Sequence, residues 1–157
     1  MLVNFGVEFL PVSSLPGHLA RRFHQLSTAL FDVEMQRSGI DLTPVQYAAL
    51  AAIFAKPEID QASLAGLIGY DRTTIGGVVD RLCDKGFVAR STNPGDRRAK
   101  VLVSTPAGAA ILERANEIVR AAQEQLVAGL DRSERKQLVQ LLEKAITALG
   151  DVSRTSR

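Results

Sequence analysis

Cysteine is almost absent from this sequence of 157 residues, in which Cys83 is the only one. A single cysteine excludes an intramolecular disulfide framework and a zinc site built from several cysteines. We therefore expect Cys83 to be a reduced thiol in a cytoplasmic protein.

Long hydrophobic runs are also absent. No stretch of about 18 apolar residues occurs, so we expect no membrane-spanning helix. The apolar segment 1–14 lacks the basic residues that open a signal peptide, and we interpret it as an N-terminal extension.

Catalytic motifs are missing as well. The sequence contains no GxxxxGK[ST], no HExxH and no GxSxG. His18 and His24 are six residues apart and do not share a helical face, which argues against a two-histidine metal site. We expect neither an enzyme nor a bound cofactor or metal.

The bulk composition is that of one folded domain. The length suffices for a sizeable core, and 46% hydrophobic with 23% charged residues is typical of globular proteins. The net charge of +2 is only a weak indication of an acidic partner, so the distribution of charge matters more than its total.

Apolar residues spaced by three and four, together with helix-start residues, predict six helices. Thr43 with Gln46 is a capping box, Asp60 and Asp71 are expected N-caps, and Ser14 is a candidate N-cap for the first helix. The predicted helices cover residues 14–35, 43–55, 61–68, 72–85, 107–129 and 132–149.

Two short extended segments, 87–91 and 99–104, flank a turn signal at 93–96 and predict a β-hairpin. Because an isolated hairpin is marginal in water, it is expected to pack on the helices before it. Helix, turn, helix and hairpin over 60–104 is the order of a winged helix-turn-helix. The expected fold class is mainly α with a small β-hairpin wing (α+β).

The domain boundaries follow from these elements. We expect an N-terminal extension 1–14, a dimerisation helix 15–40, a winged helix-turn-helix lobe 41–104, dimerisation helices 105–149 and a flexible tail 150–157. Within the lobe, the recognition helix covers about 72–85 and the wing about 87–104.

The helix at 72–85 carries the predicted DNA-reading surface. Ile75, Val78, Val79 and Leu82 form its buried stripe, and at about 100° per residue the opposite face is small and hydroxyl-rich. Short residues and an arginine suit the base edges of a major groove. The expected DNA contacts on this helix are Arg72, on phosphate, and Thr73, Thr74, Gly77 and Arg81.

The paired glycines Gly76 and Gly77 stand in the middle of that helix, where each costs about 1 kcal/mol relative to alanine. They indicate either close approach to another backbone or to DNA, or a mere irregularity of the surface.

Positive charge gathers in the same region. From Tyr70 to Lys100 there are seven basic and four acidic residues, an excess of +3 against +2 for the whole chain. Beyond the turn, we expect Arg97 to enter the minor groove, Arg98 to be braced by Asp96, and Lys100 to contact DNA. A solvated loop without function is the alternative.

Three segments resemble the MarR-type transcriptional regulators, over roughly residues 15–148. "GIDLTPVQYAALAAI" is similar to the family's second-helix segment, and "DRTTIGGVVDRLCDKGFVAR" to its recognition helix and first wing strand. "NPGDRRAKVLVSTPAG" resembles its wing signature, in which Asp96, Arg98 and Thr105 match while Ser104 stands where leucine is usual.

The resemblance implies a homodimer whose first, fifth and sixth helices form the dimer domain. Two-fold symmetry would place two recognition helices about 34–36 Å apart on pseudo-palindromic double-stranded DNA. It also implies a small-molecule effector, often an aromatic or phenolic acid, that weakens operator binding. We therefore expect a sequence-specific DNA-binding regulator that acts as a repressor and is released from its operator by a small organic ligand.

Three residues are candidates for binding such an effector. His18 and Arg22 lie beside the apolar stripe of the first helix and could hold a carboxylate, while Tyr47 could offer a phenolic hydroxyl. An interfacial polar pair and a half-buried core tyrosine are the alternatives. Two other functions stay open: a winged-helix adaptor that binds protein and not DNA, and a redox sensor using Cys83.

Overall fold

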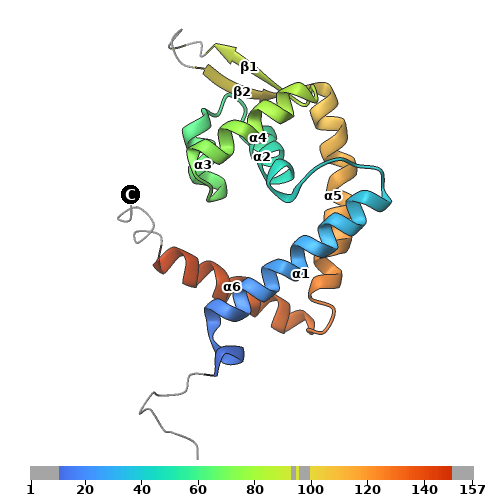
Figure 1. The fold of residues 1–157 in the computed structure, drawn as a ribbon, viewed down its shortest axis with the longest axis vertical. Coiled ribbons are helices and arrows are strands. Elements are labelled where there is room, and N and C mark those ends of the chain that lie inside the picture. The colour runs from blue at the N-terminus through green and yellow to red at the C-terminus, as the bar shows by residue number, and fades with distance from the viewer. Residues whose placement is uncertain (1–10, 93–94, 96–99, 150–157) are drawn as a thin grey trace, which may run out of the picture. The chain divides into compact units, whose positions relative to one another are not determined.

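The computed structural model describes residues 11–92, 95 and 100–149 (Figure 1). The chain divides into two compact units, the described residues up to Ala122 and those from Gln123 onward. The elements are η1 (Val12–Ser14), α1 (Pro16–Arg37), α2 (Pro44–Ala55), α3 (Gln61–Ile68), α4 (Arg72–Asp84), β1 (Val88–Thr92), β2 (Lys100–Ser104), α5 (Pro106–Leu126) and α6 (Arg132–Ala148).

The predicted order of four helices, a hairpin and two long helices is confirmed, and so are most of the helix starts. Thr43 and Gln46 close a capping box on α2, Asp60 caps α3 and Asp71 caps α4. These side chains satisfy backbone N–H groups that the first helical turn leaves unpaired.

The start of α1 differs from the prediction. The N-cap is Leu15, with no side-chain hydrogen bond, and Ser14 belongs to the short helix η1. Pro16 in the first turn supplies the helical φ without needing an N–H partner, so α1 begins without a side-chain cap. The end of α5 also differs: the helix stops at Leu126, and residues 127–130 form a turn held by the Leu130 N–H to Val127 O bond of 3.0 Å.

The core of the first unit lies under α2, α3, α4 and the hairpin, which pack together (Figure 1). Val88 and Leu102 join it from the two strands, and Leu112 and Ala115 from α5. The strands pair antiparallel, with Val88 opposite Ser104 and Thr92 opposite Lys100.

The hairpin is also tied to the connection between α2 and α3. The Glu58 N–H donates to Leu102 O at 3.0 Å, and the Leu102 N–H donates to Ile59 O at 2.9 Å. β2 therefore has neighbours on both sides at its middle residue, Leu102, which meets the expectation that the hairpin packs on the helical core.

Hydrogen bonds of Thr105 hold the N-terminus of α5 against the connection between α4 and β1. The Thr105 hydroxyl donates to Gly86 O at 2.6 Å and accepts from the Gly108 N–H at 3.0 Å, while the Thr105 N–H donates to Phe87 O at 3.0 Å. A Cβ on Gly108 would overlap the Phe87 carbonyl oxygen. Glycine at this position is what allows α5 to pack on that backbone.

Candidate nucleic-acid interface

The buried stripe of α4 is as the sequence predicts. Ile75, Val78, Val79 and Leu82 are each 3% exposed or less, so they fix which face of the helix turns away from the core. The residues on the opposite face are exposed: Thr73, Gly77, Asp80, Arg81 and Asp84. All five predicted contacts on this helix are exposed, with Arg72 and Thr74 in its first turn.

Thr74 is engaged in the helix start. Its N–H donates to Asp71 Oδ1 at 2.8 Å and its hydroxyl donates to Asp71 Oδ2 at 2.5 Å. These bonds lower the pKa of the Asp71 carboxyl below its ordinary value, the hydroxyl bond being the larger cause. With its hydroxyl proton held by Asp71, Thr74 retains only acceptor capacity, which suits a donor group on a base and not a phosphate oxygen.

An ion pair joins the outward face of α4 to β1, and sequence reasoning missed it. Arg90 Nη2 lies 2.6 Å from Asp80 Oδ1. The carboxylate raises the pKa of the guanidinium, mainly through this hydrogen bond. This acid on the outward face of α4 is thus compensated by an arginine from the neighbouring strand. The spacing of ten residues gave no periodic signal for this pair.

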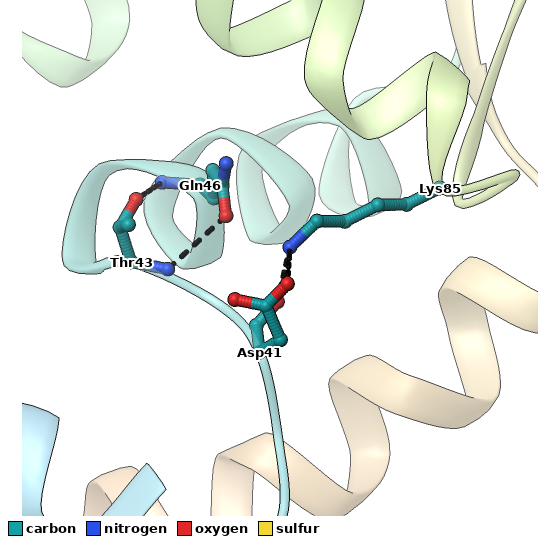
Figure 2. A network of polar contacts seen from close by, with 4 residues as sticks. All are labelled: Asp41, Thr43, Gln46 and Lys85. Atoms are coloured by element: carbon teal, nitrogen blue, oxygen red, sulfur yellow. Dashed lines mark hydrogen bonds and ion pairs between the residues drawn. The ribbon is translucent and has the colours of Figure 1, made fainter. Parts of the chain in front are cut away.

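A second ion pair removes Lys85 from the set of cations available for phosphate. Lys85 Nζ contacts Asp41 Oδ2 at 2.6 Å and donates to Asp41 O at 2.5 Å, next to the capping box of Thr43 and Gln46 (Figure 2). The contact holds the C-terminal end of α4 against the segment that leads from α1 into α2.

Because Lys85 and Arg90 are paired with acids, fewer cations are available for phosphate than the sequence count suggests. Within the described residues, no ion pair joins Arg72 or Arg81 to an acid. Lys100 is exposed on β2, and its ammonium donates to the Thr92 hydroxyl at 3.3 Å. The predicted wing contacts Arg97 and Arg98, and the bracing residue Asp96, lie outside the described residues.

The three effector candidates lie on two helices. His18 is half-buried and Arg22 exposed, both on α1. Tyr47, on α2, packs its ring 6.0 Å from that of Phe31. Phe31 follows His18 by 13 residues, or about 20 Å along a helix at 1.5 Å per residue, so α1 separates His18 from Tyr47 within one chain.

Tyr47 also has a partner that the sequence did not reveal. Its hydroxyl donates to Asn116 Oδ1 on α5 at 2.8 Å. Burial raises the pKa of Tyr47, and the positive charge of Arg120 opposes that rise. The phenol is therefore neutral at physiological pH and able to donate.

A hollow of about 470 Å³ lies between α2 and α5, beside this hydrogen bond. Its lining residues are Phe54, Ala109, Ala110, Leu112, Glu113 and Asn116. The lining combines an aromatic ring with one carboxylate and one amide, a composition suited to a small organic molecule with a polar group. Sequence reasoning named none of these residues, of which five lie on α5 and Phe54 lies on α2.

Cys83 is half-buried at the edge of the α4 stripe. Burial raises the pKa of its thiol, and the charge of Arg90, whose Nη1 lies 3.8 Å from Sγ, opposes this only in part. A thiol that resists ionisation is a poor redox sensor, which favours the interpretation of Cys83 as a packing residue.

In the part of the chain that the structure describes, no helix is long and apolar enough to span a membrane. In the same part of the chain, histidine, cysteine and carboxylate side chains form no group of three that could hold a metal ion.

Known proteins resemble the chain in sequence and in fold. The family model described as "MarR family" matches residues 42–100, which include α2, α3, α4 and β1 and end at the first residue of β2. The transcriptional repressor NicR of Pseudomonas putida is 34% identical over 135 residues, covering 86% of this chain and 84% of NicR.

Two solved structures extend the comparison. BpsR of Bordetella bronchiseptica, whose DNA binding is regulated by 6-hydroxynicotinic acid, superposes with a TM-score of 0.81 at 29% identity, covering 88% of this chain and 97% of BpsR. A mutant MarR of Escherichia coli complexed with operator DNA gives a TM-score of 0.79 at 28% identity, covering 88% of this chain and 99% of that one. The mainly helical fold with its two-stranded wing is thus that of proteins which bind operators, and this chain belongs to the MarR family of transcriptional regulators.

Proposed function

We propose that the chain is a homodimeric repressor that binds a pseudo-palindromic operator and is released from it by a small aromatic acid. The observation that carries the proposal is the outward face of α4, where Thr73, Gly77 and Arg81 are exposed with Arg72 beside them. A MarR relative with this fold is bound to operator DNA, which supports the same use of the surface here.

The DNA contacts divide into two kinds. Thr73, Thr74 and Arg81 meet base edges in the major groove, where arginine pairs bidentately with guanine. Arg72 and Lys100 meet phosphate, which orients the protein without reading sequence. The remaining proposed contacts belong to the wing: Arg97 in the minor groove, and Arg98 braced by Asp96.

The proposed dimer is supported by apolar side chains that the described residues leave uncovered. On α1, Leu19, Leu26 and Val33 are 50% exposed or more. On α6, Val139, Leu141, Leu142 and Ile146 are 40–70% exposed. Terminal helices with faces of this kind bury them against a partner, which fits dimerisation through residues 15–40 and 105–149 around a DNA-binding lobe at 41–104.

The proposed effector is an aromatic or phenolic acid. BpsR responds to 6-hydroxynicotinic acid, an aromatic acid with a polar ring substituent. The hollow between α2 and α5, with the Tyr47–Asn116 hydrogen bond beside it, supports a site for such a molecule. His18 and Arg22 remain proposed partners of a carboxylate, at a position on α1 that lies apart from this hollow within one chain.

Salt dependence of DNA binding tests the proposal. The affinity for a random duplex should fall steeply with salt, and Arg72→Ala should reduce the log–log slope by about one, because one phosphate contact is lost. Arg114→Ala is the matched control: Arg114 is exposed on α5 and carries the same charge. A flat slope for the wild-type protein would support a protein-binding adaptor instead.

The effector is tested separately by thermal shift with 6-hydroxynicotinic acid, benzoic acid and benzoyl coenzyme A. A ligand that binds the folded protein raises Tm, by an amount that grows with its concentration over Kd. The same ligand should weaken operator binding. A ligand that stabilises the protein without changing DNA affinity would contradict the proposed release.

A further inference from the structure

Nothing in the described part of the chain requires a glycine at position 77, in the middle of α4. Its φ is not positive, since the described glycines with positive φ are Gly39, Gly69 and Gly86. A Cβ built on Gly77 finds no heavy atom within 4 Å. Alanine is the better helix former at an interior position. Neither backbone conformation nor packing within the described residues explains the glycine.

The neighbouring glycine is different. Gly76 is half-buried and faces α3, where a Cβ would lie 3.3 Å from Gln61 Nε2. Packing between α3 and α4 accounts for a small residue there. A Cβ on Gly66, on α3, would also meet no heavy atom within 4 Å, so free space alone does not indicate a functional role for a glycine. The assignment of Gly77 depends on where it lies on α4.

Gly77 lies at the centre of the outward face. Thr73 is one turn before it, and Asp80 and Arg81 are one turn after it, all three exposed. The Asp80 carboxylate is held by Arg90 at 2.6 Å. The face therefore offers a hydroxyl on one side and a guanidinium on the other, with bare helix backbone between them.

We propose that Gly77 is a specificity-determining position for DNA. Its missing side chain lets a base edge in the major groove approach the backbone of α4. A methyl group would hold the helix away from the groove and lengthen the hydrogen bonds from Thr73 and Arg81, which weaken steeply with distance. The inference rests on the proposed DNA-binding function. Non-specific affinity, which comes from cations on phosphate, does not depend on Gly77.

Opposite effects on stability and on specific affinity test the inference. A duplex is first selected from a randomised pool with the wild-type protein. The Kd of Gly77→Ala for it should rise about tenfold or more, as for a mismatched base pair, while the Kd for a scrambled duplex of equal length stays within about twofold. The Tm of this variant should rise by roughly 2–4 °C, because alanine favours the helix.

Gly76→Ala is the matched control on the same helix. It should keep its Kd for the selected duplex within about twofold, because the new methyl group faces α3 and not the groove. Wild-type affinity in Gly77→Ala overturns the inference, and so does an equal loss in both variants. A wild-type protein that selects no sequence and binds no duplex instead overturns the proposed function itself.

Discussion

Replacing Gly108 by alanine tests the packing of α5 on the root of the wing. A Cβ at this buried position would overlap Phe87 O and lie 2.9 Å from both the Phe87 carbonyl carbon and Ser104 Oγ. Two of these atoms are backbone, so α5 must shift. Overpacking costs about 1–3 kcal/mol, and weakening the Thr105 N–H to Phe87 O bond about 0.5–1.5 kcal/mol. The better helix propensity of alanine returns up to about 1 kcal/mol.

These terms sum to a net loss between about 0.5 and 4.5 kcal/mol; its centre, about 2–3 kcal/mol, corresponds to roughly 4–12 °C in Tm for a chain of this size. Urea and thermal unfolding measure it, at one fixed protein concentration because the proposed dimerisation would make Tm concentration-dependent. Gly66→Ala is the control, since a Cβ there meets nothing within 4 Å and the variant should be at least as stable as wild type. If Gly108→Ala proves as stable as Gly66→Ala, the close packing of α5 on Phe87 is refuted.

Three further predictions concern single side chains. Thr43→Ala should lower the free energy of unfolding by about 1 kcal/mol in urea, because the capping box of α2 is lost, whereas Thr43→Ser should not. The pKa of Asp60 is lowered from 3.8 by hydrogen bonds from Ser63, so its stabilising effect is present above that value and lost as pH falls through the folded pKa. The urea midpoints of wild type and Asp60→Ala should therefore converge from pH 6 to about pH 2, and a constant difference would contradict the assignment. In a Tyr70→Phe variant, ultraviolet titration should show Tyr47 ionising above its ordinary value of 10.0, because burial disfavours the phenolate; ionisation below that value would exclude a buried phenol.

Much of the fold could be predicted because its signals are local. Capping residues such as Thr43, Asp60 and Asp71 act on N–H groups three residues away, and the α4 stripe follows from helical period alone. The uncapped start of α1 was not predicted. Ser14 is a residue type that often caps helices, but here it belongs to the short helix η1, and Leu15 precedes the first turn of α1.

The interface was predicted only in part, because its electrostatics depend on contacts distant in sequence. Arg90 and Lys85 counted as cations for phosphate, yet Asp80 and Asp41 pair with them in the folded chain. The partner of Lys85 is 44 residues away, and no sequence period connects the two. Likewise, the sequence leaves open whether Tyr47 serves a ligand or is a half-buried core tyrosine, and its bond to Asn116 spans 69 residues.

The pairing of β2 with Ile59 means that the wing is not a detachable appendage. Leu102 uses both its N–H and its carbonyl on the α2–α3 connection, and its side chain is 2% exposed in the core. Deleting the hairpin, or moving it to another protein, would therefore expose the hydrophobic core that Leu102 helps to fill. Substitutions meant to change DNA binding should therefore keep the buried residues of the hairpin and be confined to its solvent-facing positions, such as Lys100.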